Sequence, residues 1–347
     1  MGRDSEEILG KVSDFQTNHS GQLSDFNKFY RQYRAIPSKK RRETQSNTFV
    51  PEMFVENEAI ATAIHEMIFS DGAGLFFDMV GEDGGTDDRI RAMVSKAVIA
   101  KQLQLTDFQP KILPWLRMLS LNGTGPVATP WRLEYKSYWD GLNRVRRPAF
   151  DCWDFEPFNI VNFSFDDSHQ DLERRNWAAQ TMHVQGVEAR SMVRSGIWLD
   201  GAVKDALDKG VERNIYDTEQ RQAAGYMDVS GHGNNKGFTA HEYYGTLESR
   251  EDGEMYWAVV TSEGKFLKTP EINLYAHGEK PWLVAEWFSL PGEPYAMGIG
   301  HINSRTQSEI NDRRNFINDL LYASLYNMWL KRADSGIVLP GNKMRYS

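Results

Sequence analysis

The chain has 347 residues, of which 40% are hydrophobic, 12% aromatic and 25% charged, and its formal net charge is −8. This composition is typical of a folded chain of two or three domains and excludes a disordered or collagen-like protein. No window approaches the roughly 18 consecutive apolar residues of a membrane span, and the first residues lack the apolar core of a signal peptide. We therefore expect a protein that is assembled in the cytoplasm and has no membrane partner. A single cysteine, Cys152, excludes an internal disulfide framework and a multi-cysteine zinc site.

The acidic balance argues against a general affinity for the DNA backbone, because such binding depends on Lys and Arg displacing counterions from phosphates. One basic cluster, Arg31 to Arg42, follows an aromatic stripe from Phe26 to Tyr33 that has helical spacing. We interpret the stripe as core-facing and the cluster as a solvated edge, with contact to DNA or to a neighbouring subunit as the alternative.

The first half of the chain predicts helices followed by strands. Apolar residues at three- and four-residue steps predict helices over 55–68 and 90–98, and a third helical pattern runs over 108–121. Beyond it, residues 129–135 alternate with the period of two of a half-buried strand, and 147–165 are strand-like as well.

The second half predicts a mixed helical stretch over 171–210 and a polar linker over 212–237. Turn residues then separate three short strands between Phe238 and Leu267, which predicts a small β-meander. The longest helical pattern covers about 299–331 and would span about 45 Å, a length that suits a bundle or ring better than a small globule.

Four segments, taken in their order along the chain, resemble the portal protein family of tailed bacteriophages, especially its podovirus-like branch. They are Ser46-Asn-Thr-Phe-Val-Pro51; Asn122-Gly-Thr-Gly-Pro-Val127; His241-Glu-Tyr-Tyr-Gly245 with His277-Gly-Glu-Lys-Pro281; and Pro291-Gly-Glu-Pro-Tyr-Ala-Met-Gly-Ile-Gly300 leading to Gln307-Ser-Glu-Ile-Asn311 and Asn315-Phe-Ile-Asn-Asp319. Gly298 and Gly300 would permit a sharp chain reversal before the long helix, whose polar residues could contact neighbouring helices.

The resemblance implies an α+β fold: a portal-like subunit with an α/β wing, long stem helices and a small β-rich clip. The first implied segments are an N-terminal segment 1–44, a wing-like region 45–170, and a region 171–237 that holds the first stem helix (within 171–210) and a linker. The clip 238–290, the second stem helix 291–332 and a return to the wing over 333–347 follow. Family members usually continue well past the stem, so we expect this sequence to lack a C-terminal region.

The resemblance also implies a function and partners. The chain would be one of probably twelve identical subunits in a ring at the capsid vertex of the virion, with double-stranded DNA passing through the channel. The ring would contact the major capsid protein, the terminase motor and later the tail adaptor proteins, and it would be no enzyme and need no cofactor or metal.

Three sets of residues are candidates for these roles. The acidic turn of the clip would dock the motor and adaptors, an apolar stripe on the second stem helix would pack subunits together, and charged residues of the same helix would face the channel. In that order the sets are Glu248, Glu251, Asp252 and Glu254; Ile310, Ile317, Leu320 and Leu321; and Glu309, Asp312 and Arg313.

Other chemistries find weaker support in the sequence. Asp166, Asp167, His169 and Asp171 lie close enough together to suggest a cation site, but their spacing fits no calcium loop, and a solvated turn is the simpler interpretation. The phosphate-binding loop of an ATPase is missing. The alternatives to a portal are a tail or adaptor structural protein and a glycosidase. The glycosidase would use carboxylates that lie among tryptophans, namely Glu134, Asp140, Asp151, Asp154 and Glu156.

Overall fold

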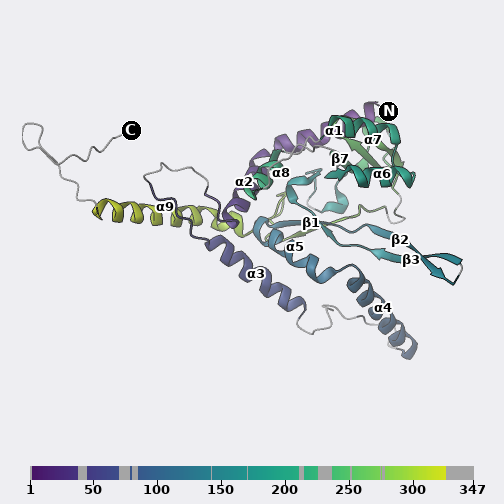
Figure 1. Cartoon of the computed structure of the whole chain (residues 1–347), viewed down its shortest axis with the longest axis horizontal. Coiled ribbons are helices and arrows are strands. Elements are labelled where there is room, and N and C mark those ends of the chain that lie inside the picture. The colour runs from purple at the N-terminus through teal and green to yellow at the C-terminus, as the bar shows by residue number, and fades with distance from the viewer. Residues whose placement is uncertain are drawn as a thin grey trace, which may run out of the picture.

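The fold is α+β, with helices packed on antiparallel sheets (Figure 1). The computed structural model describes residues 2–37, 45–69, 79, 85–141, 143–169, 171–210, 215–225, 237–250, 252–273, 275 and 278–325. The helices of these parts are α1 (Gly2–Asn18), α2 (Ser20–Tyr33), α3 (Glu52–Ile68), α4 (Thr86–Leu105), α5 (Phe108–Asn122), α6 (Gly186–Arg194), α7 (Asp200–Lys209), α8 (Ile215–Ala223) and α9 (Ile299–Leu325).

A five-stranded antiparallel sheet forms one layer of the body, with the order β5-β6-β7-β8-β9. Its strands are β5 (Phe163–Phe165), β6 (Trp177–Gln185), β7 (Gly237–Thr246), β8 (Met255–Thr261) and β9 (Phe266–Ile272). Alternate residues face opposite sides: Ala258 and Val260 pack with α1, whereas Val259 packs with α6 and α7. Helices therefore cover both faces of this sheet.

A three-stranded sheet, β10-β1-β4, joins the first layer through a shared core. It consists of β1 (Thr124–Ala128), β4 (Glu156–Pro157) and β10 (Trp282–Glu286). Phe26 and Phe29 of α2 are buried in this core, which confirms the core-facing part of the predicted aromatic stripe. Four residues of the basic cluster, Lys39 to Arg42, lie outside the described residues.

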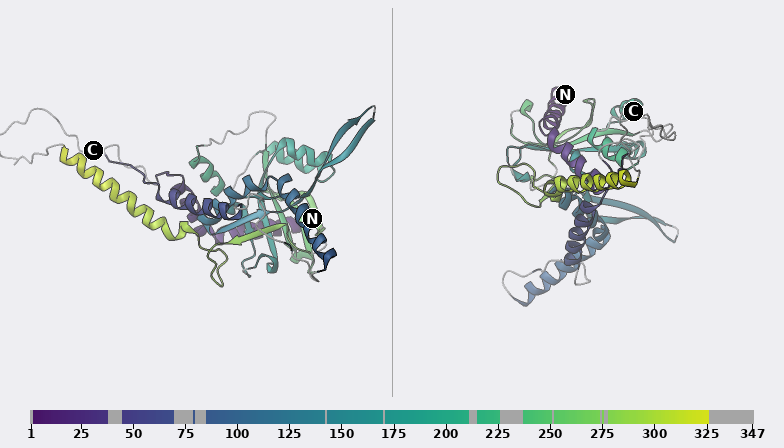
Figure 2. Two further views of the ribbon diagram at one scale, coloured as in Figure 1. Left: turned by 90° about the horizontal axis from the view of Figure 1, so that it is seen from below. Right: turned by 90° about the vertical axis from the view of Figure 1, so that its left-hand side faces the viewer.

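A long two-stranded ribbon, β2 (Trp131–Asp140) and β3 (Asn143–Trp153), projects from the body (Figures 1 and 2). The sequence predicted a half-buried strand here. In the structure the apolar side chains Leu133, Tyr135 and Trp139 are exposed, because within the described chain β2 and β3 pair with each other alone. Period-two alternation thus identified a strand but not whether its apolar face is covered.

Several predicted elements are confirmed. Helices occupy the expected stretches 55–68, 90–98 and 108–121, and α9 begins at Ile299 as expected. The predicted meander corresponds to β7, β8 and β9. Its strands are joined by short local turns, which is why local sequence sufficed.

The predicted segment boundaries at 170 and 237 do not separate structural units. β6 belongs to the expected stem region and β7 to the expected clip, yet the two strands pair from Trp177 opposite Gly245 to Gln185 opposite Gly237. In addition, β10 of the expected clip pairs with β1 of the expected wing. Residues 238–290 are therefore part of the central body and do not form a separate clip.

The first stem helix expected within 171–210 does not form there. That stretch contains β6 followed by the short helices α6 and α7. β6 is stabilised by a partner strand more than fifty residues away, a contact that helical periodicity within a local window cannot show. Among the described residues, α9 is the longest helix.

Glu242 on β7 provides a test of this packing. Its Oε1 accepts a hydrogen bond from the indole N–H of Trp257 on β8 (2.9 Å). Burial raises the pKa of Glu242 to about 7, and the negative charge of Glu156 acts in the same direction. The folded chain therefore holds this proton more tightly than the unfolded chain, whose carboxyl titrates at about 4.5.

We expect the free energy of unfolding to fall as the pH rises from about 4.5 to about 7, because only the unfolded state releases the Glu242 proton freely in that range. In Glu242→Gln this contribution is absent. The free energy of unfolding of the variant, relative to that of wild type, should therefore rise by about 2 kcal/mol from pH 5 to pH 8. Urea unfolding at both pH values measures the difference, with the exposed Glu254→Gln as control. Parallel pH dependences of wild type and Glu242→Gln would contradict this account.

Candidate assembly surface

The helix α9 begins inside the body and then leaves it (Figures 1 and 2). Ile299 belongs to the central core, whereas Phe316, Leu320 and Tyr322 are exposed. A helix of 27 residues that packs mainly by its first half presents its second half to a partner or to solvent. α9 is therefore the central element of the candidate assembly surface.

The base of α9 is fixed by a close approach of two backbones. A Cβ on Gly298 would lie 2.3 Å from the backbone nitrogen of Gly123, and one on Gly300 would lie 2.5 Å from the ring of Phe29. The sequence suggested that these two glycines permit a chain reversal. Neither has a positive φ. Glycine is therefore needed at both positions because there is no room for a side chain, and not because the backbone angle is unusual.

Four polar side chains of α9 bind the backbone of the segment 46–53 in an antiparallel register. The N–H groups of Ser46, Thr48, Val50 and Met53 donate respectively to Asp319 Oδ1 (2.6 Å), Asn315 Oδ1 (2.6 Å), Asn311 Oδ1 (2.9 Å) and Gln307 Oε1 (2.8 Å). We call these four side chains the amide ladder. They recur every fourth residue of the helix and meet every second residue of the extended segment over most of its length.

Two ladder residues also donate back to the same segment. Asn315 Nδ2 donates to the Thr48 carbonyl (3.0 Å), and Gln307 Nε2 donates to the Val50 carbonyl (2.6 Å). Gln307 and Asn315 are only 2% and 3% exposed. Since a buried amide without partners is costly, these reciprocal bonds fix the direction of α9 relative to the start of α3.

The residues predicted to pack subunits together lie further along α9. Ile317, Leu320 and Leu321 are exposed, and Ile310 is half-buried. Leu320 and Leu321 follow Ile317 by three and four residues, so the three side chains share one face of the helix. No part of the described chain covers this face.

The predicted channel-facing residues Glu309, Asp312 and Arg313 are all exposed as well. Glu309 forms an ion pair with Arg313 one turn away, a contact that stabilises a surface helix only slightly. Over Ile299–Leu325 the helix carries three acidic and three basic side chains, namely Glu309, Asp312, Asp319, Arg305, Arg313 and Arg314. This part of α9 is thus close to electrically neutral.

Two further elements expose apolar side chains. α4 has a single buried residue, Leu103, and the exposed residues Ile90, Met93, Val94 and Val98 follow helical spacing. The β2–β3 ribbon exposes aromatic side chains along its length. Figure 2 shows α4 and the ribbon projecting in different directions from the body.

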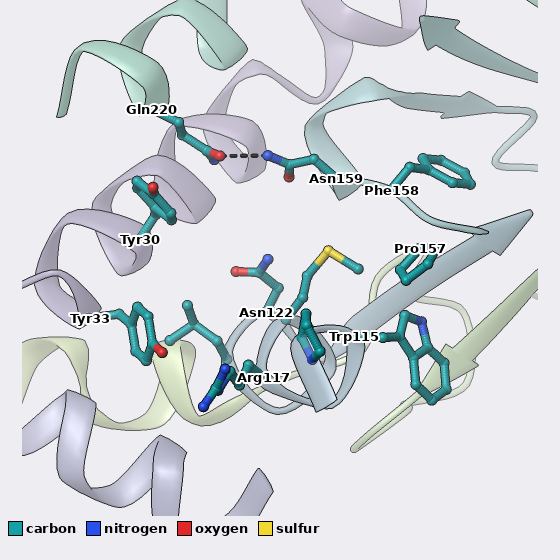
Figure 3. Close-up of a pocket in the computed structure, with 12 residues that line it drawn as sticks. Tyr30, Tyr33, Trp115, Arg117, Asn122, Pro157, Phe158, Asn159 and Gln220 are labelled. Atoms are coloured by element: carbon teal, nitrogen blue, oxygen red, sulfur yellow. Dashed lines mark hydrogen bonds between the residues drawn. The ribbon is translucent and has the colours of Figure 1, made fainter. Parts of the chain in front are cut away.

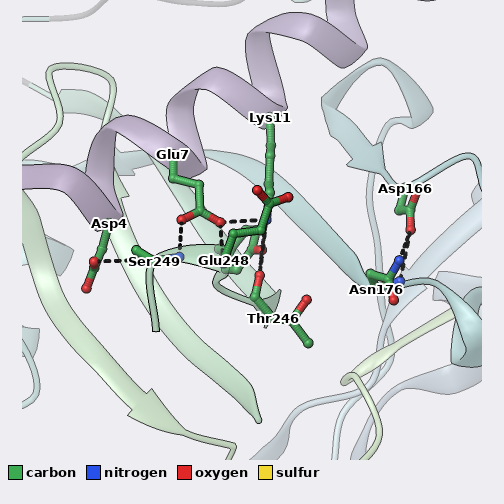
Figure 4. A network of polar contacts seen from close by, with 9 residues as sticks. Asp4, Glu7, Lys11, Asp166, Asn176, Thr246, Glu248 and Ser249 are labelled. Carbon is green, nitrogen blue, oxygen red and sulfur yellow. Dashed lines mark hydrogen bonds and ion pairs between the residues drawn. The ribbon is translucent and has the colours of Figure 1, made fainter. Parts of the chain in front are cut away.

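The predicted docking turn lies against α1 (Figure 4). The backbone N–H groups of Glu248 and Ser249 donate to the Glu7 carboxylate (2.8 and 3.1 Å), and Ser249 Oγ donates to Asp4 (2.9 Å). Burial would raise the pKa of Glu7, but its hydrogen bonds with Lys11 and these N–H groups lower it.

The structure describes three of the four acidic residues that were predicted to dock partners at this turn. Glu248, Asp252 and Glu254 are exposed, and Glu251 lies outside the described residues. Asp252 accepts hydrogen bonds from the hydroxyl of Tyr256 and from the Glu254 N–H (3.1 Å), so it also stabilises the turn. A docking role for this turn rests on its exposed charges and not on a projecting clip.

Two of the four candidate cation ligands, Asp166 and Asp171, form local contacts within the protein. Asp166 accepts hydrogen bonds from Ser168 and Asn176 (2.7 to 3.1 Å), and Asp171 lies 3.6 Å from Arg174. In the described part of the chain, no group of three or more His, Cys, Asp or Glu residues is arranged to hold a metal ion.

The candidate glycosidase carboxylates have different environments. Asp154 is 1% exposed and forms ion pairs with Lys111 and Arg132 (both 2.5 Å). Asp151 accepts the indole N–H of Trp131 (3.0 Å), and Asp140 lies at the exposed end of β2. Because Asp154 is enclosed by two cations, a sugar could not reach it in this arrangement.

Comparison with known proteins adds no relative: no protein-family model matches the chain, and no curated protein matches it. Sequence reasoning missed the amide ladder, although Gln307, Asn311 and Asn315 recur at four-residue steps. That spacing was the available signal, and the expected partner was another helix instead of an extended segment.

The amide ladder predicts a local effect of Asn315→Ala. The substitution leaves the Thr48 N–H and carbonyl without partners, which should lower the free energy of unfolding by about 2 kcal/mol. Hydrogen exchange of the amides over 46–50 should also accelerate. The matched control is the exposed neighbour Arg314→Ala, and equal exchange in the two variants would show that the ladder does not hold the segment.

Proposed function

We propose that this chain is the subunit of a phage portal, a ring-shaped conduit for double-stranded DNA at a capsid vertex. The observation that carries the proposal is the outer half of α9, a rigidly based helix with an uncovered apolar face. A contiguous exposed apolar face of this kind marks a protein interaction surface. In the proposal its partner is a different face of the same helix in a second copy.

The distribution of exposed apolar surface favours a closed ring over a simple dimer. α4, the β2–β3 ribbon and α9 all expose apolar residues, and they project from the body in different directions. Head-to-tail contacts join two different surfaces of each subunit, and they form a ring where the rotation between subunits closes. The resemblance of the four sequence segments to portal proteins makes twelve copies the expected number.

The charge of the chain suits a conduit. A net charge of −8 and a near-neutral α9 give a wall that does not hold phosphates through many cationic contacts. Glu309, Asp312 and Arg313 are the proposed channel-facing residues, and Glu248, Asp252 and Glu254 are proposed contacts for the packaging motor and the tail adaptors. No helix in the described parts of the chain has the length and apolar character that crossing a bilayer requires.

Disruption of the α9 face tests the proposal. Leu320→Asp together with Leu321→Asp should convert the ring to monomers, because burying two unpaired carboxylates between helices is costly. Native mass measurement of the purified chain reports the outcome. A matched control, Val187→Asp with Leu199→Asp, places the same charges at exposed apolar positions of α6 and of the residue before α7.

A ring of about twelve copies that is lost in the α9 variant and kept in the control supports the proposal. Rings of wild-type yield from the α9 variant would show that this face does not join subunits. A three-fold or six-fold assembly would favour a tail or adaptor protein, and hydrolysis of peptidoglycan or oligosaccharides would favour the glycosidase.

DNA binding gives an independent prediction. The assembled ring should bind short duplexes weakly and without base preference, and the affinity should fall as salt rises, because few cationic contacts are available. Fluorescence anisotropy across a salt series measures this dependence. Nanomolar binding to one particular sequence at physiological salt would contradict a conduit.

A further inference from the structure

Two hollows of the body differ in what they offer a ligand. The pocket of about 360 Å³ between α2, α5 and α8 is lined mainly by aromatic and aliphatic side chains, and on its wall the Asn159 side chain donates to Gln220 Oε1 (2.5 Å; Figure 3). A groove of about 530 Å³ beside β10 is lined instead by a strand edge and by charged side chains. Both volumes lie within the range of ligand sites, but of the two it is the groove whose lining identifies an occupant.

One wall of the groove is the free edge of β10. In the described chain β10 pairs with β1 alone. The Trp287 N–H donates to the Gly123 carbonyl (2.8 Å), so Trp287 occupies a hydrogen-bonded position of this antiparallel ladder. Because such positions alternate, the backbone N–H and C=O groups of Trp282 and Val284 point away from β1. Both residues line the groove, and no backbone group of the described chain bonds to this side of them.

A second wall is formed by the short turn Leu172–Arg174, which Lys280 holds in place. Lys280 is 7% exposed, and its ammonium group donates to the carbonyls of Leu172 (3.1 Å) and Arg175 (2.8 Å). The guanidinium group of Arg175 in turn lies 3.9 Å from the centre of the Phe165 ring in the core. Both walls of the groove are therefore fixed to the body.

The charges that a ligand meets in the groove are negative. Four carboxylates line it, of which the first three are exposed and the last is half-buried, namely Asp171, Glu173, Glu279 and Glu286. Arg174 lies 3.6 Å from Asp171 and compensates that one charge in part. The cation among the lining residues, Lys280, is buried with its ammonium group on two carbonyls.

We propose that the groove beside β10 binds an extended, lysine- or arginine-rich segment of a partner protein, which pairs with β10 as an additional strand. The N–H and C=O groups along the free edge favour a second extended backbone, since it supplies donors and acceptors at the same spacing. The carboxylates favour positive side chains on that strand. This inference goes beyond the proposed ring and does not depend on it.

Peptide binding to the full-length chain tests the proposal. The probe is a short fluorescein-labelled peptide in which lysine and valine alternate, and fluorescence anisotropy measures its affinity. Replacement of the lysines by glutamates should weaken binding about tenfold or more, because the charges then repel. N-methylation of the central amides keeps the positive charge and removes the backbone donors, so it should weaken binding to a similar extent.

Two variants of the chain separate the strand edge from the charge. Val284→Pro removes an N–H on the free side of β10 and keeps the bonds to β1, so it should weaken binding about tenfold. Glu173→Gln with Glu279→Gln should weaken binding about fivefold at low salt and less at high salt. The matched control is Glu66→Gln with Glu188→Gln, which changes exposed glutamates of α3 and α6 outside the groove.

The proposal is supported if methylation and Val284→Pro abolish most of the binding and the glutamine pair in the groove weakens it more than the control pair does. Binding that needs the lysines but is unchanged by methylation would show attraction to a charged surface alone and would overturn strand pairing. Because the methylated peptide is tested on wild type, this outcome does not depend on the folding of Val284→Pro. Absence of binding at millimolar peptide would overturn the proposal as well.

Discussion

The amide ladder between α9 and the segment 46–53 is the interaction on which the direction of the projecting helix depends. Four residues of helix advance about 6.0 Å, and two residues of extended chain advance about 6.6 Å. The two repeats match closely enough for successive side chains of α9, from Asn311 to Asp319, to meet alternate backbone groups. An apolar contact would let the helix slide or rotate, whereas paired hydrogen bonds at fixed spacing set both register and angle.

The ladder is effective because the base of α9 is equally constrained. Gly298 lies against the turn at Gly123, and the Ala296 N–H donates to Thr124 Oγ1 (3.0 Å). The turn at Gly123 also accepts the Trp287 N–H (2.8 Å), so the ends of α5 and β10 meet at the start of α9. The orientation of the exposed face of α9 is thus determined by contacts among segments that lie up to about 270 residues apart.

The elements that could be predicted from the sequence are those that depend on interactions between residues close together in the chain. The turns between β7, β8 and β9 and the start of α9 depend on nearby residues, and they were predicted. The stretch 171–210 was expected to be of mixed helical character, which holds for α6 and α7, whereas β6 was not foreseen because its partner β7 lies more than fifty residues away. The ladder was not foreseen because Thr48 and Asn315 are 267 positions apart. Ile317, Leu320 and Leu321 were identified as an apolar stripe from spacing alone, but only the structure shows that the described chain leaves them uncovered.

The exposed apolar residues are concentrated on the elements that the body holds least, namely the outer half of α9, α4 and the β2–β3 ribbon. The body itself is closed by α1, α6 and α7 over both faces of the larger sheet. Single apolar residues such as Ile272 on β9 and Leu283 on β10 are also exposed, but the longer sets of exposed apolar residues lie on the projecting elements. The sets on the projecting elements fit the proposed association between copies, because they are apolar where each element extends beyond the body, and α9 is held in place by the four side chains of the amide ladder.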